Sequence, residues 1–434
     1  MNRRLSVLTI TITILASTAM GLSQPVTIWH WETPPARVAA LDALLEKFAA
    51  DTGLSAEQVP TNFGDYQTKI LAALAANQFP EILMVNPPQV PLLLERDAII
   101  PLDDLAAELD AQYGIPAALS APYQIAGTQY GIPVLGVFWP LTYRADLYEA
   151  AGLEPPSTWD ELRHAAEALT IDENGDGNPE VYGVCLPVSS NGNYGSQVVW
   201  AFLRSNGGDI VEVVDGQQNI VFDSPETVET YRYLADLAQF SPPGKENFDW
   251  GATELLIKSG KCANVMYNGA WMRELAENDP ELLAKYAMKP MPVPEGGQAA
   301  HTGYPRALVV TRAAEQNMDS VMAFLSWLYQ PENHAALLMM EPGLFMPVTR
   351  ATAESDAFLS APVIAENQRL VSAQASIADS VSIIGFTGAT PAPSASQLES
   401  SFTLGKVLQR IVLEGMSPED AVTWGADQYR DIIR

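Results

Sequence analysis

Basic residues are scarce in this chain of 434 residues, which has 24 Lys and Arg against 52 Asp and Glu and a formal net charge of −28. Binding to nucleic acid requires clustered Lys and Arg for the phosphates, and adhesion to anionic lipid requires a similar basic patch. The composition therefore argues against both, and we predict that the protein binds no nucleic acid. The excess of acidic residues is typical of a highly soluble protein.

Signatures of catalysis are also lacking. The four histidines are scattered and show no metal-site spacing. The chain has no Gly-x-Ser-x-Gly elbow, no Walker loop and no dinucleotide fingerprint. We therefore predict that the protein is not an enzyme. Its abundant carboxylates leave one alternative, a secreted glycoside hydrolase that works with two of them.

Long apolar runs are absent beyond the first residues of the chain. Residues 5–19 are apolar, follow Arg3 and Arg4, and end in small residues, which predicts a secretory signal over 1–23. The run is too short and too rich in Thr and Ser for a membrane span. No cysteine follows the cleavage region, so a lipid anchor is not expected. We predict a soluble protein of the bacterial periplasm.

Only two cysteines occur, Cys185 and Cys262. In an oxidising compartment they allow a single pairing. They lie in two separate strand-like runs, 181–186 and 261–266, and a bridge requires their Cα atoms to lie within about 7 Å. The sequence is compatible with two alternatives, a disulfide between these cysteines and a pair of buried free thiols.

The mature chain alternates strand-like and helix-like segments, which indicates an α/β protein with a largely parallel sheet and helices on both faces. Its length suggests two domains. Three places, 132–136, 291–294 and 342–347, mix extended segments with Pro or Gly. In parallel sheets ligands bind beyond the carboxyl ends of the strands, and Trp31, Glu32 and Asn86 follow strand-like runs.

An ordered series of segments resembles the family 1 extracellular solute-binding proteins of ABC importers, the group that includes maltose-binding proteins. The resemblance covers essentially the whole mature chain, and 151–162 and the end of 260–271 are its most specific parts. The segments are 26–31 (VTIWHW), 66–74 (YQTKILAAL), 79–83 (FPEIL), 130–133 (YGIP), 141–147 (LTYRADL), 151–162 (AGLEPPSTWDEL), 260–271 (GKCANVMYNGAW) and 328–333 (LYQPEN).

The resemblance implies a two-lobe, type II-like periplasmic binding fold, with each lobe a mainly parallel sheet flanked by helices and with three hinge crossings. The three Pro- and Gly-containing places fall where crossings are expected. The ligand would be held between the lobes, whose closure is a hinge motion, and membrane permease subunits would be the partner. A monomer is expected. The predicted limits are 24–135 and 295–345 for the N-lobe, and 136–294 and 346–434 for the C-lobe.

The implied ligand is a mono- or oligosaccharide or a polyol, with a glycerol-phosphate-type ligand as the alternative. Sugars have apolar faces and hydroxyl edges, so their sites combine aromatic rings with planar polar side chains. Trp271 stands where the resembled family stacks a sugar, and we expect it to be the main platform; a core role is its alternative. The predicted ligand residues are Trp31, Glu32, Asp65, Asn86, Trp139, Tyr194, Asn268, Trp271, Tyr304 and Arg306.

Two further residues of this set, besides Trp271, have a second interpretation. Asp65 opens a helix and is also suited to cap it. Arg306 is suited to a ligand oxygen, including a phosphate, or to one of the many carboxylates of the chain.

The loop 172–180 carries Asp172, Asn174 and Asp176 at alternating positions, as a calcium loop does. Position twelve of that pattern is Gly183, so the bidentate Glu is missing. A structural Ca²⁺ and a plain hairpin are the two interpretations, and no other cofactor is expected.

Overall fold

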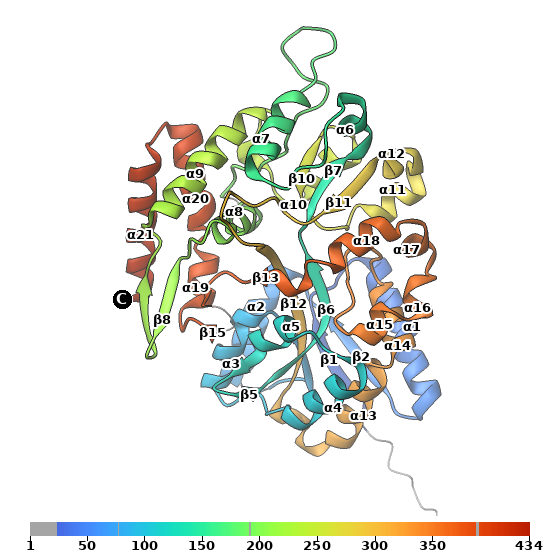
Figure 1. Ribbon diagram of the computed structural model, residues 1–434. Coiled ribbons are helices and arrows are strands. Elements are labelled where there is room, and N and C mark those ends of the chain that lie inside the picture. The colour runs from blue at the N-terminus through green and yellow to red at the C-terminus, as the bar shows by residue number, and fades with distance from the viewer. Residues whose placement is uncertain (1–23, 77, 191, 388–389) are drawn as a thin grey trace, which may run out of the picture.

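The computed structural model describes residues 24–434 apart from 77, 191 and 388–389, and the predicted signal segment 1–23 lies outside this part. The described residues form two α/β lobes, one above the other in Figure 1. We call them the lower and the upper lobe. No helix within the described ranges is long and apolar enough to cross a membrane.

The lower lobe is built on a mixed sheet with the order β13-β12-β3-β1-β2, in which β6 also pairs with β12. The βαβ segments give its parallel part, because β1 pairs in parallel with both β2 and β3. β12 then pairs antiparallel with β3 and with β6. The strands are β1 (Val26–His30), β2 (Ala56–Pro60), β3 (Ile82–Val85), β6 (Gly131–Phe138), β12 (His301–Val310) and β13 (Val381–Ser382).

Helices cover the lower sheet with apolar stripes. In α1 the residues Leu41, Leu44, Leu45 and Phe48 recur at helical spacing and are buried. The helix ends at Gly53, which has a left-handed backbone conformation and whose amide donates to the carbonyl of Ala49. The main helices here are α1 (Pro35–Thr52), α2 (Phe63–Ala76), α4 (Asp103–Tyr113), α5 (Ala117–Ser120), α13 (Met318–Leu328) and α14 (Pro331–Leu338).

The upper lobe holds a small sheet of β10 (Asn264–Met266), β7 (Leu141–Arg144) and β11 (Tyr286–Lys289), and β7 is antiparallel to both neighbours. The prediction of a mainly parallel sheet in each lobe is therefore wrong for this lobe. β10 and β11 do run in the same direction, as a βαβ unit should. However, β7 enters directly from the other lobe and inserts between them in the opposite direction.

Helices surround this sheet, and α20 and α21 lie beside α9 at the left of Figure 1. The start of α7 has a capping box, in which Thr158 and Glu161 each accept a bond from the other's backbone amide. The main helices are α6 (Ala145–Ala151), α7 (Trp159–Ala168), α8 (Tyr194–Ser205), α9 (Pro225–Leu237), α10 (Trp250–Lys258), α11 (Met272–Asn278), α12 (Pro280–Lys285), α20 (Thr403–Glu414) and α21 (Pro418–Ile433).

The chain crosses between the lobes along neighbouring segments. β6 and β12 form the first two connections and pair with each other. At the third, the amide and carbonyl of Met346 bond to those of Gly136 at 2.8 and 2.9 Å. The hinge is therefore a set of adjacent, hydrogen-bonded backbones.

Beyond the third crossing the chain contacts both lobes. The short helices α15 (Arg350–Ala353) and α16 (Asp356–Leu359) pack on the lower lobe, at α4 and α14, whereas α18 (Gln368–Ala375) packs on β11 of the upper lobe. The predicted lobe limits stay predictions, and residues 346–434 are shared between the lobes.

Candidate functional site

Aromatic rings gather where the two lobes meet. Trp139 directly follows β6, and its ring lies 5.5 Å from that of Trp250 and 5.8 Å from that of Tyr304, measured between centroids. Tyr194, the first residue of α8, lies 4.3 Å from Trp250 and 5.7 Å from Tyr267. We call these five residues the junction aromatic cluster.

Hydrogen bonds fix the upper part of this cluster. The hydroxyl of Tyr194 donates to the carbonyl of Met266 at 2.9 Å, and that of Tyr267 donates to the carbonyl of Trp250 at 2.8 Å. The Trp250 indole donates to Oδ1 of Asn193 at 3.0 Å. Trp250 is only partly buried, and no motif or spacing in the sequence assigns it to the site.

Several buried polar atoms near the junction have no hydrogen-bond partner among the described residues: Nε1 of Trp139, Oδ1 of Asn86 and Oε1 of Gln197. Asn86 directly follows β3. Gln197 lies on α8, and its backbone carbonyl accepts a bond from the hydroxyl of Thr302 on β12. Buried polar atoms are nearly always paired in native proteins. These unpaired atoms therefore indicate a place for a polar solute or for water.

A chain of ion pairs runs along the lower side of the junction. Glu32 pairs with Arg306 and, at 2.6 Å, with Arg37. Arg37 also reaches Glu341 at 3.0 Å, and Glu341 accepts from Arg273 of α11 at 2.7 Å. Arg273 belongs to the upper lobe, so the chain of pairs links the lobes.

Electrostatics keep this network charged. Burial disfavours the ionised form of Glu32, but Arg306 and Arg37 outweigh that effect and hold the pKa of this carboxyl below its ordinary value. The Arg306 guanidinium also lies over the Trp31 ring, 5.1 Å from its centroid. Trp31 is buried and packs edge-on against Tyr66. The network therefore occupies Glu32, Trp31 and one side of Arg306.

Three other predicted ligand residues, Trp271, Asn268 and Asp65, contact neighbouring residues of their own lobe. The indole of Trp271 is fully buried, lies 4.9 Å from the Tyr286 ring, and has no partner for its Nε1 in the described chain. This burial favours the core alternative, and a platform role for Trp271 stays a prediction. Asn268 accepts a bond from the amide of Ala270 at 3.0 Å. Asp65 lies exposed in the first turn of α2, bonded to Asn62.

The backbones of the two lobes approach closely beside Trp271. A Cβ atom on Gly269 of the upper lobe would lie 2.2 Å from the carbonyl oxygen of Gly343 at the third crossing. Gly343 itself has φ +89°, a conformation that favours glycine. Glycine at both positions allows this contact.

The loop 172–180 satisfies its oxygens internally. Asp172 accepts bonds from the amides of Gly175 and Gly177, each at 2.8 Å, and Asn174 accepts from that of Asp176 at 2.8 Å. No group of three or more His, Cys, Asp or Glu side chains suited to a metal ion occurs in the part of the chain that the structure describes. These bonds account for the alternating Asp and Asn pattern through local turns.

The two cysteines form a disulfide, with Cα atoms 5.6 Å apart. It joins the segment before α8 to the residues just before β10, where Tyr182 and Cys262 form an isolated parallel bridge. The bond therefore lies within the upper lobe.

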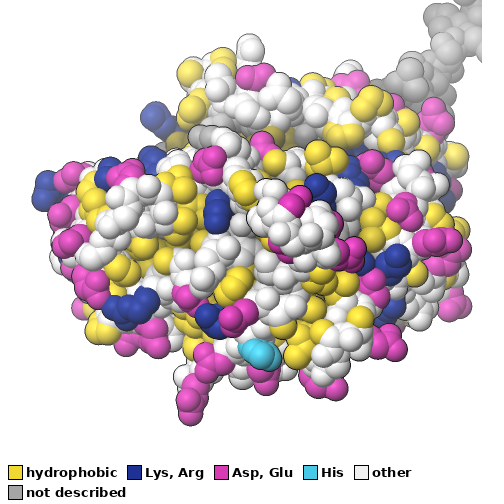
Figure 2. Space-filling model, turned by 90° about the horizontal axis from the view of Figure 1, so that it is seen from above, with side chains coloured by type: hydrophobic (Ala, Val, Ile, Leu, Met, Phe, Trp, Pro, Cys, Tyr) yellow, Lys and Arg dark blue, Asp and Glu magenta, His cyan; other side chains and the backbone are white. Residues whose placement is uncertain are grey.

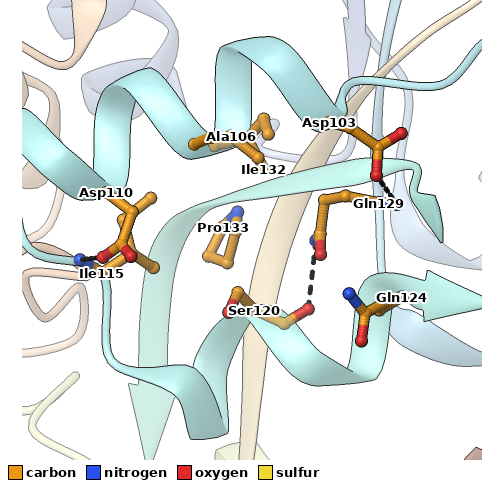
Figure 3. A pocket seen from close by; sticks show the side chains of 10 residues that line it. Asp103, Ala106, Asp110, Ile115, Ser120, Gln124, Gln129, Ile132 and Pro133 are labelled. Atoms are coloured by element: carbon orange, nitrogen blue, oxygen red, sulfur yellow. Dashed lines mark hydrogen bonds between the residues drawn. The ribbon is translucent and has the colours of Figure 1, made fainter. Parts of the chain in front are cut away.

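Two surface features lie apart from the junction. On the face in Figure 2, Lys and Arg side chains are scattered among Asp and Glu. A pocket of about 230 Å³ lies in the lower lobe beside α4 and β6 (Figure 3). Its polar groups bond to one another; for example, Gln129 donates to the carbonyl of Ser120 at 3.1 Å. None of the predicted ligand residues lines it.

Residues 32–335 match the family model of the bacterial extracellular solute-binding proteins. A putative ABC transporter periplasmic-binding protein of Escherichia coli K12 is 24% identical over 330 residues, or 74% of this chain and 72% of that protein. The mannitol-binding protein of Pseudomonas aeruginosa is 25% identical over 245 residues, or 55% of this chain and 53% of that protein.

The fold matches a solved structure over nearly its full length. The cyclic alpha-maltosyl-1,6-maltose binding protein from Arthrobacter globiformis aligns with a TM-score of 0.76 at 19% identity, covering 95% of this chain and 99% of that chain. This likeness confirms the predicted two-lobe α/β fold.

Proposed function

Because this chain belongs to the family of bacterial extracellular solute-binding proteins, we propose that it captures a neutral carbohydrate between its lobes and delivers it to the membrane subunits of an ABC importer. The carbohydrate is a mono- or oligosaccharide or a polyol. Closure around the ligand is driven by its greater affinity for the closed state.

One observation carries the choice of ligand: buried, unpaired polar atoms lie next to a set of aromatic rings at the junction. The Trp139 ring belongs to the cluster while its Nε1 has no partner in the described chain, and Gln197 and Asn86 add unpaired oxygens nearby. A sugar offers an apolar face to rings and hydroxyl groups to such atoms. The names of the maltosyl-maltose and mannitol-binding relatives support the same ligand class.

The glycerol-phosphate alternative fits less well. Two of the three unpaired atoms, those of Asn86 and Gln197, are acceptors, and in a glycerol phosphate only the few glycerol hydroxyl groups, not the ionised phosphate, offer donors to them. The guanidinium best placed for an anion, that of Arg306, is already paired with Glu32. A neutral molecule with many hydroxyl donors matches the site better.

Residues 1–23 direct export to the periplasm, where the mature chain acts as a monomer and needs no cofactor for binding. It binds its ligand without converting it. Incubation of purified protein with aryl glycosides checks the last point, since a glycoside hydrolase releases the aryl group and a binding protein does not.

A thermal-shift screen tests the ligand class. The mature chain is melted with sugars, polyols and phosphorylated glycerols, and with amino acids and metal ions as controls. We expect saccharides or polyols to raise the melting temperature, since a ligand that binds only the folded state stabilises it. Stabilisation by phosphorylated glycerols alone supports the alternative, and stabilisation by amino acids or metal ions alone refutes both.

A further inference from the structure

Glu399 is a carboxylate at the junction that the family pattern does not include. It lies on α19 (Ala395–Ser400), beyond residue 335, where the match to the family model ends. α19 packs on the short 3₁₀ turn η1 (Pro87–Gln89) of the lower lobe and on α21 of the upper lobe. The C-terminal part of the chain therefore brings α19 and Glu399 to the lobe junction, where α19 contacts the turn that follows Asn86.

The contacts of Glu399 connect it with the junction aromatic cluster. Its Oε1 accepts a hydrogen bond from the Tyr304 hydroxyl at 2.5 Å, and the Tyr304 ring packs edge-on against Trp139. Tyr304 lies two residues before Arg306 on β12, so both side chains project from the same face of that strand. Two carboxylates therefore contact side chains on this face of β12, Glu399 at Tyr304 and Glu32 at Arg306.

The two carboxylates differ in the partners that bind their oxygens. Glu32 is paired with two guanidinium groups. Glu399 has only the Tyr304 hydroxyl, and in the described residues its Oε2 has no hydrogen-bond partner and no Lys, Arg or His pairs with it. An ionised carboxylate offers about four lone-pair sites, and a protonated carboxyl keeps part of this acceptor capacity and adds one O–H donor. One neutral donor therefore leaves most of the hydrogen-bonding capacity of Glu399 unused in either form. Burial raises the pKa of Glu399 to about 7.

We infer that Glu399 is a specificity-determining residue that binds a hydroxyl group of the ligand, with Tyr304 as the positioning residue that holds the carboxyl in place. This inference rests on the proposed function. Oε2 of Glu399, which bonds to no other described residue, presents a hydrogen-bonding group to the solute, and the oxygens of Asn86 and Gln197 present acceptors. The site therefore selects ligands with several neighbouring hydroxyl donors over deoxy or anionic analogues.

Titration calorimetry with mannitol and maltose as probes tests the inference on the mature protein. The variants are Glu399→Gln, which keeps the shape of the side chain, and Tyr304→Phe. Glu366→Gln, at an exposed position on α17 (Pro362–Glu366), is the matched control. We expect Glu399→Gln to weaken binding at least tenfold and to change the relative affinity for the two probes. Tyr304→Phe should have a smaller effect, and the control none.

The outcomes separate two kinds of failure. If the unaltered protein binds neither probe nor any other saccharide or polyol, the proposed function fails and this inference fails with it. If the unaltered protein binds and Glu399→Gln retains both the affinity and the ranking of the probes, only this inference fails. The melting temperature of each variant shows that it is folded, and Tyr304→Phe gives a second measurement if Glu399→Gln is not.

Discussion

At the scale of single residues, Glu399 makes stability depend on pH. Its pKa is about 7 in the folded protein, whereas a Glu in an unfolded chain has a pKa of about 4.3. The folded state therefore retains this proton over a range in which the unfolded state releases it. The contribution of Glu399 to stability is present below the unfolded pKa and is lost as the pH rises through the folded value.

Melting curves of the unaltered protein and Glu399→Gln between pH 4 and pH 8 check this prediction. The variant cannot titrate at this position. Its melting temperature should therefore rise relative to that of the unaltered protein as the pH rises. Comparing the two proteins cancels the contributions of the buried histidines. A difference in melting temperature that stays constant over this range would contradict the expected titration.

Two tryptophans at the junction should respond differently to truncation. Trp271 is fully enclosed, so Trp271→Ala should cost about 3–5 kcal/mol of folding stability. Trp250 is partly exposed within the aromatic cluster, so Trp250→Ala should cost on the order of 2–4 kcal/mol of ligand binding. Affinity and melting temperature measured on both variants separate the roles. A stable Trp271→Ala that has lost its affinity would make Trp271 the platform.

The disulfide is the clearest feature at the scale of elements. It closes a loop with a sequence separation of 77 residues inside the upper lobe. Its reduction should lower the free energy of unfolding by about 2–4 kcal/mol. Mass spectrometry without reductant should find the chain two hydrogens lighter than its reduced form. Two thiols that alkylate readily before reduction would rule out the bridge.

Strand direction shows which aspects of the fold the sequence can predict. Alternating strand and helix segments indicate α/β units, and β1, β2 and β3 pair in parallel as expected. The strands that break the rule, β7 and β12, are those that enter from the other lobe. Their direction depends on how the chain crosses between the lobes, and local periodicity contains no information about that path.

The candidate site also contains residues that local sequence predicts and residues that it does not. Asn86 was predictable because it follows a strand-like run, and Trp139 and Tyr304 were predictable because they lie just after places where crossings between the lobes are expected. Glu399 and Gln197 arrive there on helices from distant parts of the chain. Their placement follows from tertiary packing, for which a single sequence offers no spacing rule.

At the scale of the whole molecule, the ion pair between Arg273 and Glu341 links the lobes and should favour the closed form. Arg273→Gln removes it and should weaken ligand affinity several-fold, with a larger radius of gyration in small-angle scattering. Arg163→Gln is the control, since among the described residues Arg163 forms ion pairs with Glu167 and Asp236, both in the upper lobe. Equal scattering and affinity in the two variants would mean that this pair has no part in closure.

Calorimetric titration of the mature protein with a panel of neutral saccharides and polyols measures most directly whether the junction is a carbohydrate site. We predict saturable binding of at least one of them, with one ligand per chain and a negative heat-capacity change from burial of its apolar face. Absence of binding by every saccharide and polyol, with saturable binding of an amino acid, a peptide or a metal ion, would contradict it.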